Sequence, residues 1–189
     1  MSVSRSVWLV AVAALAIGEA APAAAQDEPA KNPMVGGATM YPYQDIIHNA
    51  VNSKDHTTLV AAVKAAGLVE SLEGPGPFTV FAPTNDAFAK LPAGTVETLL
   101  KPENKAELVK ILTYHVVPGK LTTARIRSAI IAGGGTATLT TVEGEPLTAT
   151  LLYDRILLTD AKGGETRISI GNVIQSNGLI HVVEGVLMP

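Results

Sequence analysis

The residues of this chain that could do chemistry are few, and its histidines are the first to consider. His48 and His56 stand close to Asp45 and Asp55, and these residue types can ligate a metal ion or transfer protons. A metal site needs several ligands that converge, and the chain has no cysteine and no H-E-x-x-H pattern. We therefore expect no metal, and we interpret both histidines as solvated or locally hydrogen-bonded.

Two further histidines stand among apolar residues. Tyr114 and His115 lie between a helical pattern and the run Val116-Val117, and His181 alternates with apolar residues near the carboxyl end. His115 could act as a general base or as a ligand, but no nucleophile of recognisable sequence context accompanies it. We expect His115 and His181 to be neutral imidazoles that bond a backbone group or an Asn or Asp side chain.

The remaining motifs give no sign of catalysis. Gly133-Gly134-Gly135 is not followed by the G-K-[ST] of a phosphate-binding loop, and the chain has no G-x-S-x-G and no C-x-x-C. We expect a turn at the three glycines, no cofactor and no enzymatic activity. An enzyme would need His115 or His181 to share a cleft with a serine or a carboxylate at hydrogen-bond distance.

The N-terminus has the pattern of a secretory signal peptide. Arg5 precedes the apolar run Val7 to Ile17, and Ala23-Ala24-Ala25 supplies the small residues of a cleavage site. The apolar run is shorter than the roughly 20 residues that a membrane-spanning helix needs. We therefore expect residues 1–25 to be removed and the mature protein to be exported, periplasmic or secreted, without membrane insertion.

Charge and composition limit the partners. The net charge is −3, and it stays at −3 after cleavage because the predicted signal peptide carries one cation, Arg5, and one anion, Glu19. This balance provides no basic surface for nucleic acid or anionic lipid. With no cysteine, a chain of 189 residues depends on its hydrophobic core rather than on disulfides. We expect one domain and a monomer.

Residues 26–39 differ in composition from the rest of the mature chain. They are polar at first and then rich in proline, glycine and alanine, so we expect a flexible leader ahead of a domain at residues 40–189. Two amphipathic helices should open that domain, the first over Tyr43–Val51. The second has Asp55 as a candidate N-cap, Gly67 at its end and an apolar stripe formed by Leu59, Ala62, Val63 and Ala66.

The next stretch of the chain should seed the core. Phe78–Ala82 is apolar, bounded by prolines and too short for a stable helix, which predicts a buried strand. Thr84 and Asn85 are residue types that cap helix N-termini, and Asp86 places a negative charge in the first turn. This strand and helix carry all three phenylalanines of the chain, Phe78, Phe81 and Phe88.

The carboxyl-terminal half changes from helical to strand patterns. Short helices are expected over 94–100, 103–113 and 123–132. Four runs rich in β-branched residues then predict an antiparallel meander, at Thr136–Val142, Leu147–Leu152, Arg155–Asp160 and Glu165–Ile170. Asn177-Gly178 suits a turn with positive φ, and Leu179–Val183 is a further strand. Together these patterns predict an α+β fold.

Three segments resemble the signatures of one family. Phe78–Phe88 resembles the first signature of the fasciclin (FAS1) domain, and Leu112–Gly119 resembles its central Tyr-His motif. Ser176–Val183, with Val186–Pro189, resembles its second signature. The three occur in the family's order within residues 40–189, an ordinary domain size. The chain is most similar to the single-domain secreted bacterial members.

The resemblance implies both a fold and a role. It implies a wedge-like β-sandwich of about seven strands flanked by several short helices, with Phe78–Ala82 beside Leu179–Val183. It also implies adhesion to proteins or polysaccharides outside the cell rather than catalysis. Tyr114-His115 matches the motif that animal members use in integrin adhesion. Where adhesive animal domains carry an Asp-Ile pair, this chain has Asn172-Val173, and the missing carboxylate weakens any transfer of integrin recognition.

Two functions remain open at this point. The first is a non-catalytic binding or cell-adhesion module whose partner is an unknown surface protein or polysaccharide. The second is a periplasmic carrier that holds a small apolar ligand between the helices and the sheet. A large enclosed apolar pocket would favour the carrier, and a continuous exposed apolar patch near Tyr114 would favour the adhesion module.

Overall fold

The computed structural model describes residues 32–189, and the predicted signal peptide lies outside this range. The strands are β1 (Met34–Val35), β2 (Ala38–Thr39), β3 (Phe78–Pro83), β4 (Val116–Pro118), β5 (Thr136–Thr140), β6 (Pro146–Leu152), β7 (Arg155–Thr159), β8 (Glu165–Gln175) and β9 (Gly178–Val183). The α-helices are α1 (Ile46–Ala50), α2 (Thr57–Ala66), α3 (Val69–Glu73), α4 (Asn85–Ala89), α5 (Thr95–Leu99), α6 (Lys105–Tyr114) and α7 (Thr123–Ala132). Short 3₁₀ helices occupy Lys54–His56 and Pro102–Asn104.

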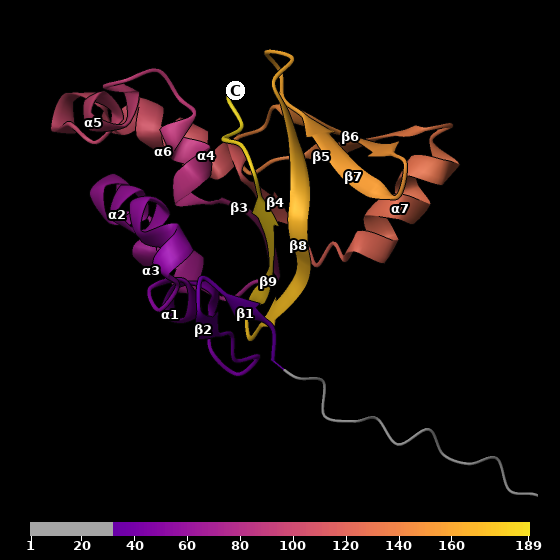
Figure 1. Ribbon diagram of the computed structural model, residues 1–189, viewed down its shortest axis with the longest axis horizontal. Coiled ribbons are helices and arrows are strands. Elements are labelled where there is room, and N and C mark those ends of the chain that lie inside the picture. The colour runs from indigo at the N-terminus through magenta and orange to yellow at the C-terminus, as the bar shows by residue number, and fades with distance from the viewer. Residues whose placement is uncertain (1–31) are drawn as a thin grey trace, which may run out of the picture. The chain divides into compact units, whose positions relative to one another are not determined.

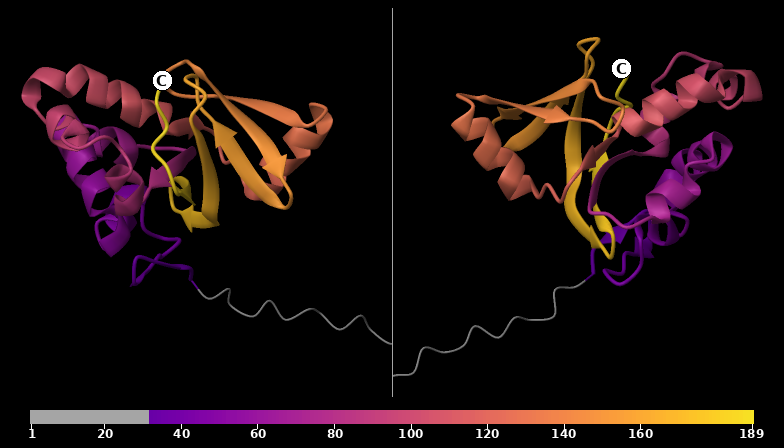
Figure 2. Two further views of the ribbon diagram at one scale, coloured as in Figure 1. Left: turned by 45° about the horizontal axis from the view of Figure 1, so that its top comes forward. Right: turned by 180° about the vertical axis from the view of Figure 1, so that it is seen from behind.

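Seven strands form one sheet, in the order β4-β3-β9-β8-β7-β6-β5, which confirms the mixed α+β fold. Helices α1 to α6 lie on one side of the central strands, and α7 packs against β5 and β6 on the other side (Figures 1 and 2). The antiparallel meander from β5 to β8 is present as predicted. β8 runs past its predicted end at Ile170 to Gln175, and this extension pairs with β9.

The centre of the sheet is the parallel pair β3 and β9, in register from Phe78 opposite Gly178 to Pro83 opposite Val183. These are the two segments that the resemblance placed side by side. The prediction of a positive φ at Asn177-Gly178 is wrong, since the turn lies at Ser176 and Asn177 and neither Asn177 nor Gly178 has a positive φ. Gly178 is needed for another reason: a Cβ there would overlap the Phe78 carbonyl oxygen, so glycine lets the two strands approach.

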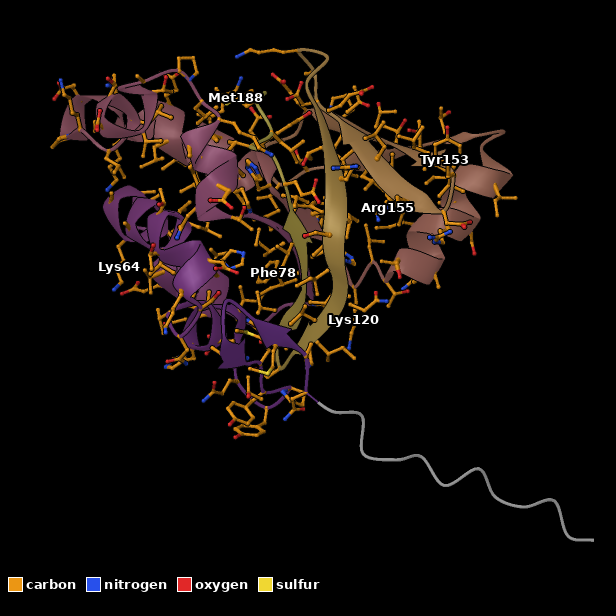
Figure 3. The ribbon with its side chains drawn as sticks, in the orientation of Figure 1. Lys64, Phe78, Lys120, Tyr153, Arg155 and Met188 are labelled. Atoms are coloured by element: carbon orange, nitrogen blue, oxygen red, sulfur yellow. The ribbon has the colours of Figure 1, made fainter. Side chains whose placement is uncertain are left out.

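Side chains alternate along β3 and divide the hydrophobic core in two. Val80 and Ala82 belong to a cluster under α1, α2 and α6, which we call the helix-side core. Phe81 belongs to a second cluster with α7 and the meander, which we call the meander-side core. Phe78, the first residue of β3, is labelled in Figure 3, and its partly buried side chain packs against the helix-side core.

The helices begin and end largely as their sequences predict. The apolar stripe of α2 is buried, and Gly67 ends this helix with a φ of 72°. Thr84 caps α4, because its hydroxyl accepts a hydrogen bond from the Ala87 amide at 3.2 Å. Asn85 instead caps α2, since its Oδ1 accepts from the Thr58 amide at 3.0 Å; Asp55 makes no side-chain cap.

The folded region begins earlier than residue 40. β1 and β2 lie within residues 26–39, for which the sequence suggested a flexible leader, and Val35 is buried in the helix-side core. Gly36 and Gly37 have φ values of 58° and 76°, as a type I′ hairpin turn requires. The glycines that suggested a spacer therefore close a hairpin.

Candidate functional site

Tyr114 lies at the carboxyl end of α6 with its side chain fully buried. The hydroxyl donates a hydrogen bond to the Pro146 carbonyl oxygen at 2.8 Å and accepts one from the Ala161 amide at 3.1 Å. Burial raises the pKa of the Tyr114 phenol above its ordinary value. The side chain thus joins α6 to both ends of the β6–β7 hairpin and presents no surface to a partner.

His115, the C-cap residue of α6, is also buried. Its Nδ1 donates to the Ile111 carbonyl oxygen at 2.8 Å, and its Nε2 accepts from the Leu187 amide at 3.0 Å. Burial lowers the pKa of His115 to about 4, against the opposing effects of the Ile111 carbonyl and Asp160. The ring is the neutral, backbone-bonded imidazole expected from the sequence, and it ties α6 to the carboxyl-terminal segment.

Asn172 joins β8 to the start of α7. Its Oδ1 accepts from the Thr123 amide at 2.8 Å, and its Nδ2 donates to the Thr123 hydroxyl at 2.7 Å. Its φ of 59° lies in the left-handed region, which asparagine tolerates better than most residues. An aspartate could not donate the second of these bonds. Val173, its neighbour, is fully buried.

His181 completes this junction. Its Nδ1 accepts from the Asn172 amide at 3.2 Å, and its Nε2 donates to the Leu121 carbonyl oxygen at 2.7 Å. Its ring stacks on Phe81 with 5.6 Å between centroids, and burial lowers its pKa. The hydrogen bonds of the Asn172–His181 network and those of the Tyr114–His115 pair have no residue in common. Tyr114, His115 and Val173 are all buried, so the two motifs do not present one exposed surface, although His115 and Val173 line the same cavity.

An acidic and imidazole cluster lies where α1 contacts α3. Asp45 caps α1 by accepting from the His48 amide at 2.9 Å, and its other oxygen lies 2.6 Å from His48 Nδ1. The possible ligand atoms of Asp45, His48 and Glu73 all lie within 4.8 Å of one another. No sequence pattern links Glu73 to Asp45 and His48, because only the packing of α3 on α1 brings it near them. The cap and the exposed His48–Asp45 bond account for the arrangement without a metal.

The helix-side core contains an apolar cavity of about 40 Å³. It lies between the first two helices and the sheet, and its polar lining residues are Ser53, His56 and His115. The other lining residues are Val35, Met40, Ile46, Ile47, Ala50, Leu59, Val60, Val63, Leu72, Val80, Ala82, Leu112, Val116, Val173 and Ile180. No sequence signal marks this cavity, because its walls come from segments far apart in the chain.

Two tyrosines form an exposed aromatic surface after the β1–β2 hairpin. The rings of Tyr41 and Tyr43 stack with 5.2 Å between centroids, and the residues are 36% and 72% exposed. We call Tyr41 and Tyr43 the tyrosine pair. Met34 on β1 is 62% exposed. Neither tyrosine was singled out from the sequence, since single exposed aromatics carry no pattern.

Comparison with known proteins identifies the family. A model of the Fasciclin domain matches residues 54–189. Protein sll1483 of Synechocystis sp. is 46% identical over 187 residues, which cover 98% of this chain and 97% of that protein. Immunogenic protein MPB70 of Mycobacterium bovis is 34% identical over 192 residues, covering 94% of this chain and 91% of that protein.

Two further similarities concern the surface and the fold. Cell surface glycolipoprotein MPB83 of Mycobacterium bovis is 34% identical over 166 residues, covering 85% of this chain and 68% of that protein. The solved structure of a FAS1 domain pair from the insect cell adhesion molecule fasciclin I matches with a TM-score of 0.68 at 17% identity. It covers 78% of this chain and 52% of that chain, and it supports the fold alone. The match to the family model and the bacterial relatives together show that this chain belongs to the fasciclin domain family.

Proposed function

We propose that this protein is an exported, non-catalytic binding module that attaches to a polysaccharide or protein of the cell surface. The family, the relative named a cell surface glycolipoprotein and the signal peptide pattern support this role. None of the helices in residues 32–189 is long and apolar enough to cross a membrane. The buried Tyr-His motif is not the contact surface in this proposal, because Tyr114 and His115 are both inaccessible.

The tyrosine pair is the observation that carries the proposal. Tyrosine rings supply rigid contact area together with a hydroxyl that can hydrogen-bond, and they are enriched where proteins bind partners. The loop beneath the pair is fixed, since the buried Asn49 accepts from the Tyr41 amide at 2.9 Å and donates to the Tyr41 carbonyl at 2.7 Å. A surface that is already ordered loses little entropy on binding.

A binding assay with matched variants tests this proposal. Mature protein is incubated with purified envelope polysaccharide and, separately, with solubilised envelope proteins. The double variant Tyr41→Ala/Tyr43→Ala should bind its partner at least tenfold more weakly, because truncated tyrosines at contact surfaces are common hot spots. The control is Tyr153→Ala, which removes a tyrosine that is 94% exposed on the β6–β7 turn beside α7 (Figure 3).

The outcomes separate the parts of the proposal. Equal binding by the double variant and the wild type would reject the tyrosine pair as the contact surface. Failure of the mature protein to bind either fraction would reject the binding module itself. If only Tyr153→Ala lost binding, the contact surface would be the β6–β7 turn of the meander and not the tyrosine pair.

A further inference from the structure

We propose that a groove between β7 and β8 binds a sugar that carries one carboxylate group, such as a uronate unit. The groove is lined by the start of α7, the β6–β7 turn and the middle of β8. Its volume is about 490 Å³, within the range of roughly 300–1,000 Å³ that small-molecule sites occupy. It shares no residue with the tyrosine pair, so it is a second site that goes beyond the proposed function and does not depend on it.

The groove forms because β7 and β8 separate near the start of β7. Their antiparallel pairing ends at Leu157 opposite Arg167, although β7 begins at Arg155, so the strands spread apart here (Figure 1). Continued pairing would place Arg155 opposite Ser169, and both residues line the groove instead. β8 also shifts its register against β9 twice along this stretch, and such irregularities re-aim side chains and are common beside functional sites.

Two residues with strained backbones flank the groove. Tyr153 and Asn172 are the only non-glycine residues within 32–189 that have a positive φ, at 53° and 59°. Tyr153 precedes the lining residue Asp154, and Asn172 follows the lining residue Gly171. Such conformations cost free energy and cluster at sites that bind ligands. Their positions therefore favour a binding role for this groove.

Two guanidinium groups give the groove its preference for an anion. Neither Arg127 nor Arg155 forms an ion pair with another residue of the range 32–189. Glu184, which also lines the groove, is neutralised by Arg167, whose Nη2 lies 2.6 Å from Glu184 Oε2. Two cations against the one remaining carboxylate, Asp154, leave a single positive charge. This charge matches a monocarboxylate, and a guanidinium can bind both oxygens of a carboxylate at once.

The other polar groups suit a sugar better than a bare anion. The Thr123 hydroxyl accepts a hydrogen bond from Asn172 Nδ2 at 2.7 Å and can still donate one. The Ser169 hydroxyl donates to the Val182 carbonyl oxygen at 3.1 Å and can still accept one. Asp154 adds a carboxylate acceptor, which disfavours a doubly charged anion such as phosphate. Sugar hydroxyls both donate and accept, so a hydroxyl-rich ligand satisfies all three groups.

The two groove arginines differ in how firmly they are held. Arg127 is half-buried, and its Nη2 donates a hydrogen bond to the Asp154 carbonyl oxygen. A guanidinium has several further donors, which remain for a ligand. Because this side chain is already ordered, it loses little freedom when a ligand binds. Arg155 is exposed (labelled in Figure 3), so it can be replaced without disturbing the core.

Titration of the mature protein with glucuronate, followed by backbone amide NMR shifts, tests the site. Glucose is the matched control ligand, because it differs from glucuronate only by a CH₂OH group in place of the carboxylate. We expect saturable shifts at Arg155, Ser169 and Gly171 with glucuronate, and at least tenfold weaker binding of glucose. Acetate, which has the carboxylate but no sugar hydroxyls, should also bind at least tenfold more weakly.

Two exposed arginines provide a matched pair of variants. Arg155→Gln removes a groove cation that forms no ion pair within residues 32–189, and it should weaken glucuronate binding about tenfold. Arg125→Gln removes a cation of α7 that does not line the groove, and it should bind like the wild type. The double variant Tyr41→Ala/Tyr43→Ala should also bind glucuronate like the wild type, so this test is independent of the tyrosine pair.

Several results would overturn the proposal. One is the absence of saturable shifts at the groove residues of the wild type. Another is glucose, acetate or inorganic phosphate binding as tightly as glucuronate, since the groove would then not recognise a carboxylated sugar. Tighter binding of an acidic tetrapeptide than of glucuronate would identify a protein partner instead. The last is undiminished binding by Arg155→Gln, and the comparison of ligands decides the matter if this variant fails to fold.

Discussion

The two hydrophobic cores on either side of β3 are built differently. The meander-side core places Phe81 against His181 and Tyr114 against two backbone groups, and every polar atom of Tyr114 and His181 has a partner. The helix-side core contains an apolar cavity of about 40 Å³. Within residues 32–189, the apolar cavity thus lies on the helix side of β3.

Because the two cores differ in this way, we expect them to respond differently to substitution. A close-packed core with satisfied polar groups favours a single rigid arrangement. A core with a void gives up contacts that its lining atoms could make, and natural proteins keep such features mainly where a function needs them. We therefore expect truncations in the meander-side core to cost the most stability, and substitutions around the cavity to alter packing and the pH response.

The largest effect is expected in the meander-side core, from Phe81→Ala. Phe81 is fully buried, so its truncation leaves a void and should lower the free energy of unfolding by about 3–5 kcal/mol. Urea denaturation measures this loss, provided that the free energy of unfolding falls with urea concentration at the same slope in the variant and the wild type. A variant as stable as the wild type would show that the meander-side core is not close-packed.

The next effect is a pH response from the helix-side core. The pKa of His115 is about 4 in the folded protein and 6.5 when the ring is free, so between these values the unfolded chain binds the extra proton. The contribution of neutral His115 to the free energy of unfolding is therefore complete above pH 6.5. It is lost as the pH drops toward 4, and the total loss is about 3 kcal/mol.

Unfolding free energies of the wild type and His115→Gln at pH 4, 5, 6 and 7 isolate this contribution. The variant should be less stable at pH 7, because two backbone groups lose their partner, and its stability should depend less on pH. Comparing the variant with the wild type at each pH removes the contributions that do not involve His115. If the unfolding free energies of the variant and the wild type changed in parallel with pH, His115 would not be the source of the pH dependence.

The smallest effect comes from the same substitution in both cores. Ala82 lines the cavity on β3, and Ala149 on β6 is fully buried in the meander-side core. Ala82→Val should raise the free energy of unfolding by about 1 kcal/mol, because it fills space in the cavity. Ala149→Val should destabilise by about 1–3 kcal/mol, because it adds volume where none is free. Thermal unfolding measures the stability of both variants. If both lost the same amount of unfolding free energy, the two cores would not differ in packing.

Much of the fold could be predicted because its signals are local. The stripe of α2, the N-cap at Thr84 and the strand at β3 depend on neighbouring residues whose spacing repeats with the geometry of a helix or strand. The meander could be predicted for the same reason. The family signatures added the pairing of β3 with β9, which no local pattern contains.

The features that were missed or misplaced depend on distant contacts. Asn85 is a good N-cap residue type, but its side chain caps the helix before its own. Gly36 and Gly37 suit a spacer as well as a hairpin, and only the burial of Val35 decides between them. The apolar cavity is visible only once α1, α2 and the sheet enclose it.

The parallel pairing of β3 with β9 has a consequence for how the chain folds. The middle of the sheet joins residues 78–83 to residues 178–183, so it cannot close until the second of these segments has been synthesised. Contacts between such distant residues form slowly. Until β9 pairs with β3, the edge of β3 is open and can pair with strands of other chains. A protein built this way should need protection from aggregation while it is synthesised, and losing β9 would split the sheet through its centre.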